Sequence, residues 1–143
     1  MSGQDIKNHS ELTDLDFVKQ FSETSLPASL FTHEAHIRLA WIHIKKYGLL
    51  EAERNVSMQL KNYVKSLGAE DKYHETLTIA GIKAVNHFLM QSETKSFSAF
   101  IKENGILLSD FKQLIQSHYS TNIFNSKPTK LKYLEPELIP FSK

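Results

Sequence analysis

The chain has 143 residues and no cysteine, which excludes disulfides, thiolate metal sites and cysteine nucleophiles together. Long apolar runs are also missing: nowhere do about 18 uncharged apolar residues follow one another, as a membrane helix needs. The first twelve residues are polar and do not look like a signal peptide. We therefore expect a cytoplasmic protein with no membrane segment.

An excess of charge of one sign is lacking as well. The 17 Lys and Arg residues balance 16 Asp and Glu residues, and no stretch gathers the basic ones. Nucleic-acid binding normally needs a basic face that meets the phosphates, so we expect no nucleic-acid partner. Glycine-rich phosphate loops and the nucleophile elbow are absent too, which leaves nucleotide binding and serine-hydrolase chemistry without support.

What the chain does have is apolar surface and length for one domain. Apolar residues make up 41% of the sequence, including nine Phe, five Tyr and one Trp, which is enough to bury a core. We expect the polar residues 1–12 to form a flexible N-terminal arm. Residues 13–143 are then predicted to form a single helical domain.

Apolar residues recur at steps of three or four, and capping residues precede several of these stretches. Thr13 can cap a short helix that ends near Ser22, and Thr32 can cap a helix over 33–47 that ends at Gly48. Further helices are predicted over about 50–66, 73–91 with Asp71 as a cap, 96–104, and 110–118 with Ser109 as a cap. The fold class is therefore all-α, an irregular bundle of about five to six helices.

The last part of the chain loses the helical period. Pro128, Pro136 and Pro140 interrupt it, because proline lacks the N–H that a helix interior needs. The residues between these prolines are nevertheless too apolar for a solvated tail. We expect an extended C-terminal segment packed on the bundle.

Histidines stand at the starts of two predicted helices. The motif FTHEAH at 31–36 carries two imidazoles three residues apart, so both project from one side of a helix. His33 falls near the middle of the apolar stripe of that helix, and His36 lies on its flank. The motif YHETLT at 73–78 opens the long helix and turns His74 inward. An inward imidazole points from each of the two helix starts.

These residues suggest a metal centre if the two helix starts lie side by side. His33, His36 and His74 would then bind a divalent ion, and nitrogen ligands of this kind suit zinc or ferrous iron. Glu75 would be a fourth ligand or the general base for a bound water, and Thr78 is the other catalytic candidate. The motif lacks the HExxH spacing of helical zinc proteases, so the hypothesis is a small metal-assisted enzyme without protease activity.

The alternative is a structural role, in which each imidazole bonds a carbonyl, a hydroxyl or a carboxylate. The chain would then be a non-enzymatic helical module that binds a small ligand or a partner protein. A homodimer is open in either case. Two further residues are expected outside any site: Arg38 projects away from the apolar stripe and should be exposed, and His9 falls in the expected flexible arm.

Several pieces of the chain resemble a family of small helical bacterial proteins. They are Leu26-Pro27, the stretch FTHEAHIRLAW at 31–41, YHETLT at 73–78, Tyr119-Ser120 and LEPEL at 134–138. The corresponding family motifs look like (F/W)THxAHLRxAW, YHET(L/I)T and EPDL, and the likeness spans roughly residues 16–140. Glu137 stands where Asp is usual. The resemblance implies that the candidate histidines, Glu75 and Thr78 form a shared site, and it implies no activity.

Overall fold

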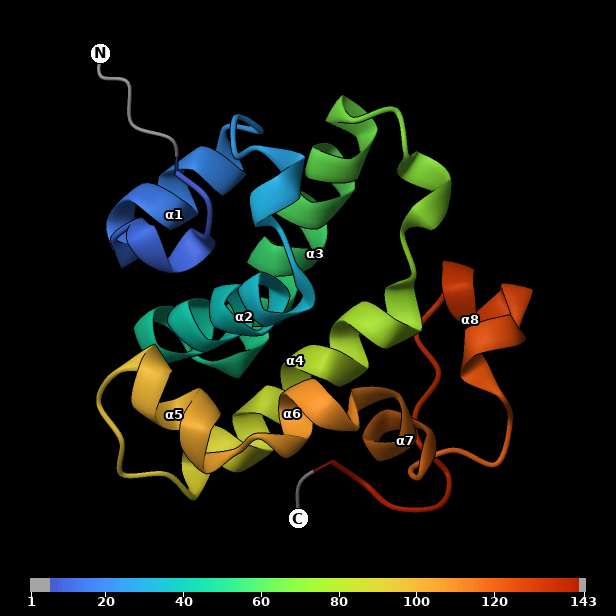
Figure 1. Ribbon diagram of the computed structural model, residues 1–143. Helices are drawn as coiled ribbons and strands as arrows, with labels where there is room; N and C mark the ends of the chain where they lie inside the picture. The colour runs from blue at the N-terminus through green and yellow to red at the C-terminus, as the bar shows by residue number, and fades with distance from the viewer. Residues whose placement is uncertain (1–5, 142–143) are drawn as a thin grey trace.

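The computed structural model describes residues 6–141, and every regular element within them is a helix (Figure 1). The α-helices of this range are α1 Asp14–Ser22, α2 His33–Tyr47, α3 Leu49–Ser66, α4 Glu75–Met90, α5 Phe97–Glu103, α6 Ile106–Ser109, α7 Phe111–Gln116 and α8 Lys127–Leu131. The all-α prediction is confirmed. None of these described helices combines the length and the apolar character that a membrane span requires.

Side-chain caps set the starts of the first helices. The hydroxyls of Thr13 and Thr32 accept hydrogen bonds from the backbone N–H groups of Asp16 (3.1 Å) and Ala35 (3.2 Å), as predicted. Gly48 separates α2 from α3 with φ +86° and ψ 170°, a backbone region that glycine adopts readily and other residues do not. The predicted bounds of α1, α2 and α3 are therefore confirmed to within about a residue.

Two of the predicted caps were wrong. The long helix α4 begins after His74, whose Nδ1 accepts the N–H of Leu77 (3.1 Å), and Asp71 lies earlier in a short 3-10 turn. Helix α7 follows Asp110 directly, while Ser109 ends the additional short helix α6. The cap of α4 is a local contact, but histidine is not among the residues that are preferred as N-caps, so it was not predicted.

The C-terminal segment is only partly extended. Pro128 stands in the first turn of α8, where a missing N–H costs nothing, so a short helix forms in a region predicted to have none. Residues 132–141 contain no helix and pack on the bundle as expected. There the Tyr119 hydroxyl donates to the carbonyl of Leu134 (2.8 Å), and the Phe141 side chain is buried.

Helices α2, α3 and α4 form the centre of the molecule, and each packs against the other two (Figure 1). Eight of the 15 residues of α2 are buried, which makes it the most enclosed of the three. Helices α6 and α7 lie against α2 and α4, and α8 packs on α4. The main apolar core lies among α1 to α4 and includes buried residues of α5 and α6, and a second cluster joins α4 to α7 and the C-terminal segment.

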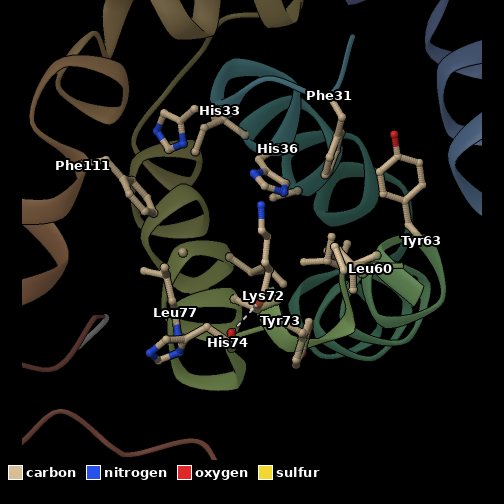
Figure 2. A pocket seen from close by; sticks show the side chains of 18 of the residues that line it. Phe31, His33, His36, Leu60, Tyr63, Lys72, Tyr73, His74, Leu77 and Phe111 are labelled. Carbon is tan, nitrogen blue, oxygen red and sulfur yellow. Dashed lines mark hydrogen bonds between the residues drawn. The ribbon is translucent and has the colours of Figure 1, made fainter. Parts of the chain in front are cut away.

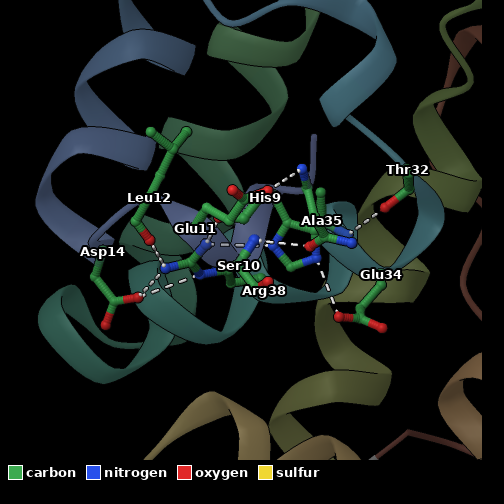
Figure 3. Close-up of polar contacts among 10 residues, drawn as sticks. His9, Ser10, Glu11, Leu12, Asp14, Thr32, Glu34, Ala35 and Arg38 are labelled. Carbon is green, nitrogen blue, oxygen red and sulfur yellow. Dashed lines mark hydrogen bonds and ion pairs between the residues drawn. The ribbon is translucent and has the colours of Figure 1, made fainter. Parts of the chain in front are cut away.

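Arg38 is buried, with only 6% of its surface exposed, so the prediction of an exposed arginine was wrong. Its guanidinium donates to the backbone carbonyls of His9 (2.6 Å) and Leu12 (2.8 Å) and to the carboxylate of Asp14 (2.8 Å) (Figure 3). It also lies over the ring of Phe17 at 4.7 Å. The partners belong to the segment before and at the start of α1, which the sequence periodicity of α2 cannot show.

The chain before α1 is packed as well. His9 is buried; its Nδ1 accepts from Arg38 (3.2 Å), and its Nε2 donates to the carboxylate of Glu34 (3.1 Å) (Figure 3). Burial and the neighbouring Arg38 charge lower the pKa of His9. Where we expected a flexible arm over 1–12, residues 8–12 fold onto α2, and residues 1–5 lie outside the described range.

The Arg38 contacts make a stability prediction. Arg38→Ala should lower the free energy of unfolding by about 2–4 kcal/mol, because it leaves buried carbonyls without donors. Arg54→Ala is the matched control, since Arg54 makes only an exposed pair with Glu51, and it should change stability by less than about 0.5 kcal/mol. Urea unfolding followed by circular dichroism measures both. Equal losses in the two variants would contradict the anchoring role of Arg38.

His43 is a buried titratable group in the core. It is 2% exposed, and neither ring nitrogen has a hydrogen-bond partner among residues 6–141. Desolvation, reinforced by the charge of Lys46, lowers its pKa to about 4 from the ordinary 6.5. The folded protein therefore holds this ring neutral, whereas the unfolded chain protonates it in weak acid.

This difference predicts a pH dependence of stability. Between the unfolded pKa of 6.5 and the folded value of about 4, the unfolded state binds the extra proton, so stability is full above this window and falls as pH drops through it. His43→Leu should reduce the fall by up to about 1.4 kcal/mol per pH unit. Urea unfolding at about pH 8 and about pH 5 tests this. Parallel losses in wild type and variant would contradict it.

Candidate functional site

A pocket of about 470 Å³ lies among the start of α2, the second half of α3 and the first half of α4 (Figure 2). This volume is within the range of small-molecule sites, roughly 300–1,000 Å³. Its walls are mainly apolar, and the largest of their side chains include Phe31, Leu60, Leu77, Ile82, Phe111 and Phe124. The pocket therefore combines the size and the wall chemistry of a ligand site.

Small residues on the helices leave space for the pocket. Ala40 on α2 and Gly81 on α4 both line it. A methyl group at Gly81 would stand 3.2 Å from Cζ of Phe111, closer than ordinary van der Waals contact, so the glycine lets this ring lie directly against α4. The ring of His33 meets Phe111 edge-on at 4.7 Å between centroids, and together they form one wall.

Most of the predicted site residues line this one pocket. His33 and His36 reach it from α2, while His74 and Thr78 reach it from the start of α4 (Figure 2). Glu75 is not among the lining residues. Its carboxylate accepts the hydroxyl of Tyr73 (2.5 Å) and lies 3.9 Å from Nζ of Lys61. The structure thus brings the three imidazoles to a common cavity and turns the carboxylate elsewhere.

Two of the three imidazoles are bonded to main-chain oxygens. Nε2 of His33 donates to the carbonyl of Leu107 (2.9 Å), and Nε2 of His74 donates to the carbonyl of Ile123 (2.8 Å). A carbonyl can only accept, so each Nε2 carries a hydrogen. Nδ1 of His74 also accepts the N–H of Leu77, and both nitrogens of that ring are therefore in use. His74 caps α4 and ties it to the segment before α8.

His36 is the exception. Its ring packs edge-on against Phe31 with 4.0 Å between centroids, it is accessible in the pocket, and neither nitrogen is hydrogen-bonded within residues 6–141. Desolvation by the surrounding protein, together with the nearby His33, lowers the pKa of His36 to about 4. The neutral ring offers one N–H donor and one acceptor nitrogen. Of the three imidazoles it has the most hydrogen-bonding capacity left for a bound molecule.

These contacts do not fit a metal centre. Among the described residues, no group of three or more His, Cys, Asp or Glu side chains is placed to hold a metal ion. Zinc needs three or four ligands at about 2 Å, and His74 has no free nitrogen to offer. A zinc or iron ion on the predicted residues would require the contacts of His74 to Leu77 or Ile123 and of Glu75 to Tyr73 to break.

Two lysines also line the pocket. Lys72 stands in the 3-10 turn before α4, and Lys112 stands on α7; no Asp or Glu belongs to the described lining. The sequence placed Lys72 in a polar loop and gave no reason to connect it with the histidines. The charged side chains of the lining are therefore all basic, which favours a ligand with a negative group.

Comparisons of the chain with models of known families, with curated proteins and with solved structures find no match. The resemblance to the helical bacterial family stays a prediction. The chemistry of the site therefore rests on the pocket and its hydrogen bonds.

The role of His74 can be measured. His74→Ala should lower the free energy of unfolding by about 1–3 kcal/mol, because it removes the cap of α4 and one donor to the carbonyl of Ile123. His74→Asn can still cap the helix but is too short to reach Ile123, so its loss should be smaller. Urea unfolding of both variants tests this order. An alanine variant as stable as wild type would show that the two contacts contribute nothing.

Proposed function

We propose that this chain is a non-enzymatic binding domain whose pocket takes a small, mainly apolar molecule. The observation that carries the proposal is the partly open pocket of about 470 Å³ between α2, α3 and α4. Protein interiors are otherwise packed as densely as organic crystals. Unfilled apolar space of this size between α2, α3 and α4 is typical of a site that holds a ligand.

The hydrogen bonds around the pocket favour binding over catalysis. The Thr78 hydroxyl donates to the carbonyl of His74 one turn back (2.7 Å), so its proton is engaged by the backbone and not by a base. Glu75 is engaged by the Tyr73 hydroxyl outside the lining. Two of the imidazoles act as tethers to main-chain oxygens. The residues that sequence reasoning assigned to a reaction thus serve mainly to hold the walls in place.

We also propose a cellular location for the domain. We place the domain in the cytoplasm, because a chain without cysteine suits a reducing compartment.

Metal analysis of protein purified without a histidine tag separates the binding domain from the metal-assisted enzyme. Stoichiometric zinc or iron that disappears in His36→Ala would favour the metal-assisted enzyme over the binding domain.

A variant that fills the pocket tests the proposal. Thr78→Phe projects a ring into the cavity and sacrifices only a hydroxyl that bonds its own helix, so the fold should persist. Binding of the apolar dye anilinonaphthalene sulfonate, followed by its fluorescence, should weaken at least about tenfold. Ser98→Phe, on an exposed position of α5, is the control and should bind as wild type does. Unchanged dye binding by Thr78→Phe would overturn the proposal.

A further inference from the structure

We infer that the ligand of this pocket is a monocarboxylic acid with an apolar chain or ring, whose acid group bonds the His36 imidazole. The inference rests on the proposed binding function and adds the chemical class of the ligand. Three observations carry it: the apolar walls, the absence of Asp and Glu from the described lining, and the open nitrogens of His36.

The charged side chains of the lining favour a ligand with a negative charge. Lys72 and Lys112 bring positive charge to the pocket from two different elements, the turn before α4 and helix α7. With no carboxylate among the described lining residues to offset them, a cationic ligand is repelled and an anionic one attracted. The walls then require that the rest of the molecule be apolar, because a second polar group would lose water without gaining a partner.

We expect the acid group of the ligand to lie beside His36. A purely apolar ligand would cover this ring and leave a donor and an acceptor without partners, which costs about 1–3 kcal/mol. A carboxylic acid gives one of the two ring nitrogens a partner, because its proton or one of its oxygens can bond that nitrogen. His33 and His74 cannot replace it to the same extent, because each already donates from Nε2 to a main-chain carbonyl.

The proton balance of binding follows from this pairing. The free acid is ionised near neutral pH, and His36 is neutral, because desolvation by the pocket walls lowers its pKa to about 4 although the ring stays accessible. We infer a pair that shares a proton, as imidazolium and carboxylate or as neutral imidazole and protonated acid, and forming such a pair takes one proton from the solvent. The pair is then held as a charge-neutral unit in a poorly hydrated site.

Other titratable groups surround His36. They are His33 on α2, Tyr63 on α3, Lys72 and Tyr73 before α4, His74 at its start, and Lys112 on α7. Burial raises the pKa of both tyrosines, so they stay neutral. A carboxylate bound by a lysine alone would take up no proton, which separates the two modes.

Calorimetry on the full chain tests the inference. Decanoate is compared with decanol, and naphthoate with naphthalenemethanol, in phosphate and in Tris at about pH 7. We expect each acid to bind at least about tenfold more tightly than its alcohol. The apparent enthalpy should differ between the buffers by the amount that one proton per ligand requires. The dissociation constant should rise up to about tenfold per pH unit above neutrality.

Three variants test which residue is responsible for the proton taken up on binding. In His36→Leu the proton uptake should disappear and the preference for acid over alcohol should shrink, whereas His87→Leu, which lies outside the lining, should keep both. Lys72→Gln should weaken the acids without changing the proton uptake. Uptake that persists in His36→Leu would overturn the role of His36. If His36→Leu does not fold, the His36 ring resonance of wild type, which should shift on adding decanoate, decides the point.

The binding results distinguish a wrong ligand class from a wrong binding function. If the alcohols bind as tightly as the acids and no proton is taken up, the ligand is not an acid, although the pocket still binds. If dye, acids and alcohols all fail to bind, or if Thr78→Phe leaves their binding unchanged, the binding function itself is wrong.

Discussion

The arrangement around the pocket depends on one side chain that bonds with both ring nitrogens at once. Nδ1 of His74 accepts the N–H of Leu77 in the first turn of α4, and Nε2 donates to a carbonyl 49 residues further along the chain. The cap determines where α4 begins, and therefore which of its residues face the cavity at steps of three and four. The second bond holds Ile123 in place, so that the adjacent Phe124 can close the lining. The His74 imidazole thus fixes both the start of α4 and the position of the pocket wall at Phe124.

Helix α2 is held in a comparable way at two points. His33 ties its start to Leu107, 74 residues away in sequence, and Arg38 ties its middle to Asp14 and the segment before α1. Of the 15 residues of α2, eight are buried. Because the pocket walls are fixed by contacts of the protein with itself, the cavity is formed before any ligand arrives. Such preorganisation reduces the entropy that binding would otherwise cost.

The predictions that succeeded depend on neighbours in sequence, whereas the burial of Arg38 and the roles of the imidazoles depend on distant partners. The starts of α1 and α2 follow from Thr13 and Thr32, whose hydroxyls bond residues three positions away. Arg38 was misplaced because its partners lie 24 or more residues away, and helical projection ignores them. The short helix α8 was missed because Pro128 was treated as a breaker, although proline is tolerated in a first turn.

The same difference between local and distant contacts explains which features of the site could be predicted. Helix phase places His33, His36 and His74 on inward faces, but whether an imidazole is a tether or a free group is decided by carbonyls at 107 and 123. The pocket walls could not be recognised at all. Leu60 repeats at the same helical steps as the fully packed residues of α3, and a periodic apolar position looks alike whether a neighbour or an empty space faces it.

The energetics of the empty space limit what the pocket can be. Residual cavities in cores cost about 24 cal/mol per Å³, so a sealed, dry void of 470 Å³ would cost on the order of 10 kcal/mol. This is as large as the whole stability of a typical domain, about 5–15 kcal/mol. A folded chain of this size cannot carry such a void, so the space must be reached by water or filled by a ligand. Water gains few hydrogen bonds along walls of Phe, Leu and Ile, and an apolar molecule displaces it at little cost. The few polar side chains that remain accessible then decide which apolar molecule is held.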